Sequence, residues 1–172
     1  LDENSYISLF AFINNTQIGK YCSISMNFKS GLGQHPTKFI STSPVFYSKK
    51  YAIKNSLAND KSSFQEYEKV VIGNDVWIGA DVIVMDGVTI GNGAIIASKS
   101  VVVRDVPNYA IVGGVPGNII KYRFSKEIIN ALEKLEWWNW NHEKLKKSKS
   151  FFTQEITLES IQKLIEFNAG TK

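Results

Sequence analysis

The stretch from Ile72 to Pro107 reads IGNDVW-IGADVI-VMDGVT-IGNGAI-IASKSV-VVRDVP and divides into six consecutive hexads. Every hexad begins with Ile or Val, and its fifth residue is always small or β-branched. A fixed short period of this kind is typical of a parallel β-solenoid, in which each hexad supplies one short strand and one bend. The first and fifth residues point inward and stack on their equivalents in the next coil. The pattern argues against a helix, because three- and four-residue spacing is absent and β-branched residues dominate.

The same phase reappears upstream and then stops. Ile18 and Ile24 lie a whole number of hexads before Ile72, and Cys22 takes an inward fifth place, where we expect a small core residue rather than a nucleophile. Between residues 31 and 69 the hexads disappear. Long interruptions inside a compact domain are often functional, and this one contains His35.

After Val106 the repeat decays, and the chain changes character. Ser125, Asn141 and Thr157 are the expected N-caps of three helices, which we expect to close the open end of the solenoid. The chain therefore divides, within one domain overall, into four expected segments. They are N-terminal β-helix coils at 1–30, an inserted active-site loop at 31–69, the main hexapeptide-repeat β-helix at 70–122 and a C-terminal helical cap at 123–172.

Composition narrows the class of protein. The 172 residues are 44% hydrophobic and 21% charged, which is ordinary for a soluble globular domain. No apolar run approaches the roughly 20 residues that span a bilayer, and no signal-peptide pattern is present, so we expect no membrane span and a cytoplasmic location. The net charge of +4 is small, and we expect no nucleic-acid binding, which requires a broader basic surface. A single cysteine excludes an intrachain disulfide.

Five short motifs resemble those of a known family. They are Asp105-Val106-Pro107, Ile111-Val112-Gly113-Gly114-Val115-Pro116, Gly33-Gln34-His35-Pro36, Ser41-Thr42-Ser43-Pro44 and Trp137-Trp138-Asn139-Trp140. Together with the hexads they resemble the hexapeptide-repeat, left-handed β-helix acyltransferases. The resemblance covers nearly the whole chain and is closest to the branch of hexapeptide-type chloramphenicol and streptogramin acetyltransferases and related sugar O-acetyltransferases.

The resemblance implies an all-β solenoid, namely a left-handed parallel β-helix with an inserted active-site loop and C-terminal capping α-helices. Three hexads would form one triangular coil. Acetyl-CoA would be the acyl donor, and the active protein would be a homotrimer with its active sites between subunits. The left-handed winding follows from the resemblance alone, because crossover connections are usually right-handed.

An eighteen-residue coil would place Ala80, Ser98 and Pro116 in one column, and Asp86 level with Arg104. The resemblance implies that acetyl-CoA lies extended along a subunit edge. Backbone groups of Ala80 and Ser98 would pair with the pantetheine amides, and basic side chains would meet the CoA phosphates. The implied cofactor contacts are Trp77, Gly79, Ala80, Ser98, Arg104, Pro116 and Lys121. Each of these residues could equally be an ordinary coil position or a solvated surface residue.

His35 is the expected catalytic residue. It stands where the resembling family has its general base, and an imidazole can take a proton from a hydroxyl at neutral pH. The activated oxygen would attack the thioester carbonyl directly, without a covalent acyl-enzyme, and a backbone N–H would stabilise the oxyanion. The sequence does not reveal which group orients the ring.

The acceptor is open at this stage. A hydroxyl of a sugar or polysaccharide precursor is the first expectation, a hydroxylated antibiotic such as a streptogramin or chloramphenicol is the alternative, and a sugar amine is third. Phe39, Phe46 and Tyr47 could form an apolar wall near His35. A zinc site would need three histidines, and the chain has two, so no metal is expected. A non-catalytic β-solenoid binding protein is a second alternative, but it would leave the histidine segment without a role.

Overall fold

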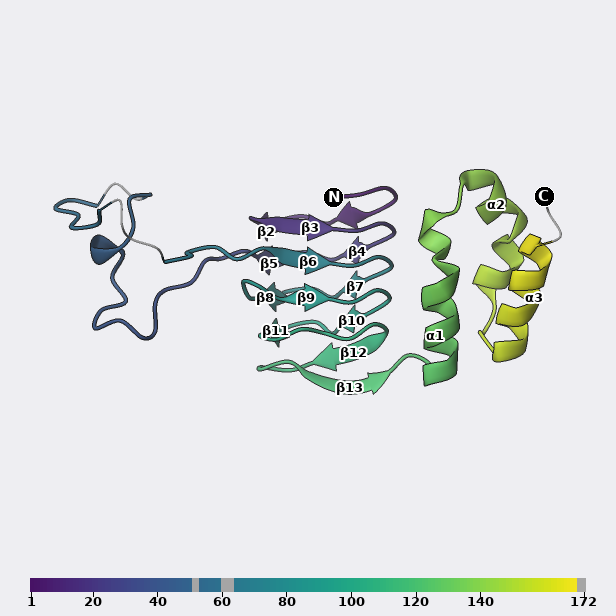
Figure 1. Cartoon of the computed structure of the whole chain (residues 1–172). Coiled ribbons are helices and arrows are strands. Elements are labelled where there is room, and N and C mark those ends of the chain that lie inside the picture. The colour runs from purple at the N-terminus through teal and green to yellow at the C-terminus, as the bar shows by residue number, and fades with distance from the viewer. Residues whose placement is uncertain (51–52, 60–63, 170–172) are drawn as a thin grey trace.

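A computed structural model describes residues 1–50, 53–59 and 64–169 and shows a stack of β coils with helices along one side (Figure 1). Three sheets form the walls of the stack. The first sheet has the order β1 (Tyr6–Ile7), β4 (Ser23–Ile24), β7 (Trp77–Ile78), β10 (Ile95–Ile96), β12 (Ala110–Gly113) and β13 (Asn118–Tyr122). The second has the order β11 (Val101–Val102), β8 (Ile83–Val84), β5 (Lys29–Ser30) and β2 (Phe12–Ile13). The third has the order β3 (Thr16–Ile18), β6 (Val70–Ile72) and β9 (Thr89–Ile90).

The hexad phase sets the register of the stack. Ile24, Ile78 and Ile96 are aligned partners on neighbouring parallel strands, and all three are buried. The fifth residues of the hexads, such as Val76 and Val82, are buried beside them. The predicted parallel β-solenoid is therefore confirmed, and Cys22 lies fully buried in its core, as expected.

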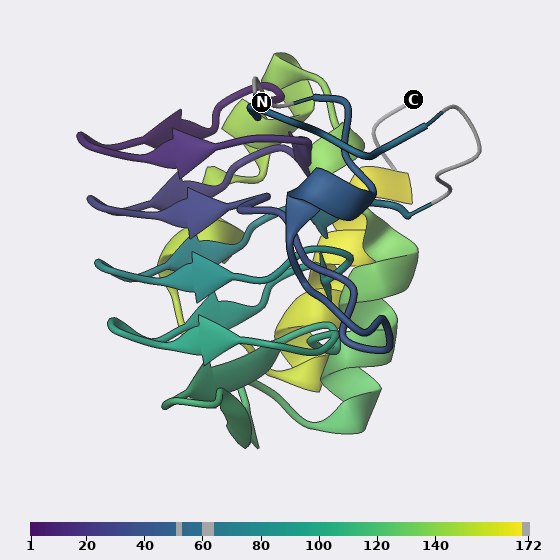
Figure 2. The ribbon, with the colours of Figure 1, turned by 90° about the vertical axis from the view of Figure 1, so that its left-hand side faces the viewer.

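The bends between sheets form three edges that run along the stack, and each edge has a different attachment. The bends after the third sheet, which include Asn92, form the helix edge. The bends after the first sheet, which include Ser98, form the Ser98 edge. The bends after the second sheet, which include Asp86 and the inserted residues 31–69, form the insertion edge. Figure 1 shows the insertion and the helices on opposite sides of the stack, and Figure 2 views the stack from the side of the insertion.

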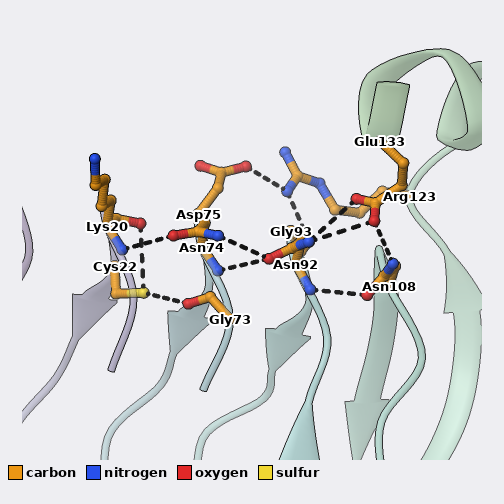
Figure 3. A network of polar contacts seen from close by, with 10 residues as sticks. All are labelled: Lys20, Cys22, Gly73, Asn74, Asp75, Asn92, Gly93, Asn108, Arg123 and Glu133. Atoms are coloured by element: carbon orange, nitrogen blue, oxygen red, sulfur yellow. Dashed lines mark hydrogen bonds and ion pairs between the residues drawn. The ribbon is translucent and has the colours of Figure 1, made fainter. Parts of the chain in front are cut away.

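A ladder of asparagines runs along the helix edge (Figure 3). The side-chain oxygen of Asn74 accepts a hydrogen bond from the backbone N–H of Lys20, that of Asn92 from the N–H of Asn74, and that of Asn108 from the N–H of Asn92. The Asn92 and Asn108 side chains donate in turn to the carboxylate of Glu133. The ladder satisfies backbone donors at successive bends and attaches a helix to the solenoid.

The C-terminal segment forms the helices expected for it. They are α1 (Lys126–Leu135), α2 (His142–Lys147) and α3 (Leu158–Ala169), with short 3-10 turns η2 (Trp137–Asn139) and η3 (Lys149–Thr153) between them; η1 (Pro44–Phe46) lies in the insertion. Ser125 and Asn141 accept from the backbone N–H groups of Ile128 and Lys144, and Thr157 accepts from that of Ser160, so the three predicted N-caps are confirmed.

The expected position of these helices was wrong. They lie along the helix edge rather than over the open end of the solenoid, and the antiparallel strand β13 follows β12 as the last strand of its sheet (Figure 1). The physical reason is that the helix edge offers both an apolar contact and hydrogen-bond donors to the helices. Leu132 of α1 and Ile161 of α3 pack in one cluster with Tyr109, which belongs to the edge, and Glu133 of α1 meets the asparagine ladder.

The eighteen-residue period also ends before the last coil. Asn74 and Asn92 are eighteen residues apart, whereas Asn92 and Asn108 are sixteen apart, and Ile96 pairs with Val112. Pro116 therefore does not share the register of Ser98, so the predicted column of three is wrong in its third member. The two residues are lost in the bend after β11, because Val84 still pairs with Val102 eighteen residues on, whereas Ile90 pairs with Val106 sixteen residues on. Within the described residues, no helix has both the length and the apolar character needed to cross a membrane.

Candidate functional site

The insertion joins the solenoid through a narrow neck of two legs, residues 31–35 and 65–69 (Figure 1). The outgoing leg begins at Gly31, which has a φ of 65° and whose Cβ, if present, would lie 1.8 Å from the carbonyl oxygen of Asn14, so only glycine fits. The two legs then pair with each other. The backbone N–H of Gln34 donates to the carbonyl of Glu66 at 2.9 Å, and the Gln34 side chain donates to the Glu68 carboxylate at 2.9 Å.

His35 is the last residue of the outgoing leg, and its ring is held through one nitrogen. Nδ1 lies 3.0 Å from the carbonyl oxygen of Thr42 and 2.6 Å from the hydroxyl oxygen of Tyr47. The Tyr47 hydroxyl itself lies 3.4 Å from the same carbonyl. Both partners come from the segment that folds back over the histidine, so the insertion supplies the orienting groups that the sequence alone did not reveal.

These contacts favour one tautomer of His35. A carbonyl oxygen only accepts hydrogen bonds, so Nδ1 must carry the hydrogen to bond Thr42. The Tyr47 proton can then point to the same carbonyl, and every polar group is satisfied. Nε2 is left with a lone pair, and the exposed ring can present it to a bound molecule. The geometry therefore makes His35 chemically competent as a proton acceptor.

Tyr47 is the centre of the packing around the histidine. It is only 5% exposed, and its ring centroid lies 5.1 Å from that of Phe64 and 6.5 Å from that of Phe39. Burial, and next the charge of Glu66, raise the pKa of Tyr47, so its hydroxyl keeps its proton at neutral pH. Of the expected apolar wall, Phe39 and Tyr47 come together near His35 with Phe64 as a third member, while Phe46 is 53% exposed.

The Ser98 edge carries part of the expected cofactor set. Trp77 is 56% exposed on the outer face of β7, in the outward place expected for it. Gly79 approaches the next coil so closely that an added Cβ would lie 2.6 Å from the nitrogen of Ser98. The backbone N–H of Ala80 donates to the Ser98 hydroxyl at 3.2 Å, and the carbonyl of Ala80 accepts from Lys99. The Ala80 amide thus already has a partner, which a pantetheine amide would have to replace.

The remaining expected cofactor residues lie elsewhere. Arg104 is exposed beyond β11, which keeps the eighteen-residue register with β8, and its guanidinium lies 3.4 Å from the Asn118 side-chain oxygen. Pro116 is exposed in the bend before β13, and Lys121 is exposed on β13 itself. One chain therefore does not gather the expected set around His35, because the Ser98 edge and the insertion edge are different edges of the solenoid.

Sequence reasoning missed several residues of this site. Tyr47 was noted only as a possible wall residue. The neck residues Glu66 and Glu68, and Asp86 in the bend between β8 and β9, were not assigned to the site. Pairing between two legs more than thirty residues apart has no local signature in the sequence. Within residues 1–50, 53–59 and 64–169, no three His, Cys, Asp or Glu side chains come together in a metal-binding arrangement.

The sequence of this chain is similar to those of several known acetyltransferases. Residues 69–104 match the family described as bacterial transferase hexapeptide (six repeats). A chloramphenicol acetyltransferase of Klebsiella aerogenes is 43% identical over 132 residues, covering 75% of this chain and 61% of that protein. A probable macrolide acetyltransferase of Lysinibacillus sphaericus is 52% identical over 91 residues, covering 53% of this chain and 51% of that protein. The chain thus spans about half to three fifths of the length of these relatives.

Solved structures add a likeness of fold. A variant of AntD, an N-acyltransferase from Bacillus cereus in complex with dTDP-4-amino-4,6-dideoxyglucose and Coenzyme A, superposes with a TM-score of 0.55 at 21% identity. The superposition covers 77% of this chain and 67% of that one. At this level of identity the likeness concerns the fold alone.

Proposed function

We propose that the chain is a hexapeptide-repeat acyltransferase, namely an acetyl-CoA-dependent acetyltransferase in which His35 is the general base. Support comes from the hexapeptide match over residues 69–104 and from the chloramphenicol acetyltransferase that is 43% identical to it. The observation that carries the proposal is the fixed imidazole. Nδ1 bonds to Thr42 and Tyr47, which leaves Nε2 as the basic nitrogen on an exposed face of the insertion. We also infer that the coils wind left-handed, in keeping with the family.

The proposed reaction is a direct transfer. Nε2 of His35 takes the proton of the acceptor hydroxyl while the oxygen attacks the thioester carbonyl of acetyl-CoA. The tetrahedral intermediate collapses, the carbon–sulfur bond breaks, and the CoA thiolate leaves and takes up a proton. The neutral Tyr47 and the Thr42 carbonyl hold the ring throughout, and their contact with Nδ1–H favours the imidazolium formed in the first step.

The proposed cofactor contacts require a second copy of the chain. Trp77, Ala80 and Ser98 lie on the first sheet or the Ser98 edge, away from the insertion edge that carries His35. A homotrimer would bring the Ser98 edge of one subunit to the insertion of its neighbour, and the exposed Trp77 would then be covered by CoA or by protein. Static light scattering at micromolar concentration should give three times the mass of the chain, and a monomer would contradict this arrangement.

For the acceptor we propose a hydroxylated antibiotic. The support comes from the relatives named chloramphenicol acetyltransferase and probable macrolide acetyltransferase, which align with this chain at 43% and 52% identity. Phe39, which is exposed and packs against Tyr47 and Phe64, offers an apolar surface suited to such a molecule. The sugar hydroxyl expected first from the sequence has weaker support, because the sugar-acting neighbour shares the fold alone.

An acceptor panel tests this proposal. Release of free CoA thiol from acetyl-CoA is followed with chloramphenicol, a streptogramin, a macrolide and a nucleotide sugar as acceptors, each with and without the protein. We expect turnover with one of the antibiotics and only background hydrolysis with the sugar. Turnover with the sugar alone would replace the antibiotic assignment, and no turnover with any acceptor would contradict the proposed activity.

Removing the Tyr47 hydroxyl should weaken the reaction without abolishing it. Tyr47→Phe keeps the packed ring and leaves Thr42 on Nδ1, so we expect kcat to fall by about fivefold, the scale of one net hydrogen bond of about 1 kcal/mol. The KM for acetyl-CoA should not change. Tyr21→Phe removes a hydroxyl from a tyrosine on the helix edge, where its ring contacts Trp137, and serves as the matched control. An unchanged kcat in Tyr47→Phe would show that Thr42 alone orients the ring.

A further inference from the structure

Asp86 lies in the bend between β8 and β9, on the insertion edge, and contacts the neck. Its carboxylate is divided between the two legs. Oδ1 accepts the backbone N–H of Gly33 at 2.9 Å, and Oδ2 accepts the backbone N–H of Glu68 at 3.2 Å. One side chain of the solenoid thus joins the outgoing and the returning leg, which are 35 residues apart in the sequence. Hydrogen bonds to an ionised carboxylate are stronger than neutral ones, and Asp86 is half-buried, which limits screening by water.

The residue after Asp86 brings the bend still closer to the returning leg. Gly87 has a φ of 80°, and an added Cβ would lie 2.5 Å from Oε2 of Glu68. The other oxygen of Glu68 accepts from the Gln34 side chain at 2.9 Å. The series of contacts therefore runs from Asp86 through Gly33 and Glu68 to Gln34, the residue that directly precedes His35.

The contacts of Asp86 serve the neck rather than the coils. The solenoid keeps its register on both sides of the insertion through strand pairing, with β5 against β8 and β6 against β9. Loss of the carboxylate would leave these ladders in place and release the two legs from the β8–β9 bend, although Gln34 would still join them to each other. From this division we propose that Asp86 is a positioning residue that clamps the neck and thereby fixes the place of His35. The inference rests on the proposed function for its catalytic consequence, although the clamp itself does not.

A graded series of variants tests the role. Asp86→Ala removes both acceptors, and Asp86→Asn retains one. We expect kcat to fall by roughly tenfold to a hundredfold in Asp86→Ala, the scale of a small misplacement of a catalytic group, and by less in Asp86→Asn. The KM for acetyl-CoA should be unchanged in both. The amides of Gly33 and Glu68 should exchange their hydrogens faster than in the parent protein, in the same order.

Glu133→Ala is the matched control. Like Asp86, Glu133 accepts two hydrogen bonds, here from the side-chain amides of Asn92 and Asn108, but it lies on the opposite side of the stack. It should lower the melting temperature and leave kcat and the two neck amides unchanged. A histidine signal read by NMR completes the design, since the chain has only two histidines and His35→Ala identifies the relevant resonance. The His35 resonance should shift in Asp86→Ala and stay in place in Glu133→Ala.

Each outcome decides a separate statement. Unchanged exchange at Gly33 and Glu68 in Asp86→Ala would overturn the clamp. Faster exchange with an unmoved His35 resonance, or with an unchanged kcat, would overturn the positioning role. If the parent protein shows no acetyl transfer at all, the proposed function fails, while the exchange and NMR measurements still decide whether Asp86 fixes the histidine.

Discussion

His35→Ala is expected to lower kcat by about a hundredfold or more, the usual scale for losing a general base. The reason is the position of Nε2, which is the one ring nitrogen of His35 not engaged by Thr42 or Tyr47. Binding of acetyl-CoA, measured by calorimetry, should change little, because the histidine acts on the acceptor hydroxyl. The melting temperature should also hold, because the ring is exposed and the stacked coils do not depend on it.

His142→Ala is the matched control, since this second histidine begins α2 on the helix side of the stack and is exposed. It should retain full activity. A His35→Ala variant with the parent's kcat would remove the residue from the chemistry. Joint loss of activity and of the proposed trimer would indicate a structural role instead.

The second large effect concerns stability. Ile78 is fully buried between its aligned partners Ile24 and Ile96, so Ile78→Ala opens a cavity that neighbouring coils cannot fill without breaking their register. We expect the free energy of unfolding to fall by about 3 kcal/mol, within the range for such truncations. Urea unfolding at one fixed protein concentration measures this loss and keeps any assembly equilibrium constant.

Ile78→Val tests the same position with one methyl group removed and should lower the free energy of unfolding by about 1 kcal/mol. The ratio of the two losses is the informative quantity. If Ile78→Ala were no more destabilising than Ile78→Val, the aligned isoleucines would not be packed as a core, and the stack would draw its stability mainly from its backbone ladders.

The solenoid was predictable because its physics is local and repeated. Each hexad carries its own inward Ile or Val, as at Ile72 and Ile90, and a single period places every copy in the core. The end of the repeat was not predictable in the same way. The last coil is two residues shorter than the others, so Pro116 does not align with Ser98 as predicted. The helices lie along the edge where the Asn92 and Asn108 side chains donate hydrogen bonds to Glu133. A hydrogen-bonded edge is not visible in a hexad pattern.

The sequence predicts His35 as the base of the candidate site, which stays a prediction, but it does not predict the residues that contact or position His35. His35 stands out as a histidine in the one long interruption of the repeat. Tyr47 and Asp86 act through contacts across twelve and more than fifty residues of sequence, and neither belongs to a motif. The expected cofactor residues stay a prediction. Several of them lie on a different edge from His35, so they could meet His35 only if a neighbouring subunit supplied them.

The neck has a consequence for how such proteins change. The strands before and after it, β5 and β6, pair with β8 and β9 as they would in an uninterrupted solenoid. The register of the coils therefore does not depend on the length of the segment between β5 and β6. Doubling the length of a flexible loop raises its closure free energy by only about 0.6 kcal/mol. The segment beyond the two legs can thus be shortened, extended or exchanged for a foreign sequence while the scaffold stays the same. Recombination at two points in the gene, one in each leg, would then be enough to replace the segment that contacts a bound molecule while the coils stay unchanged.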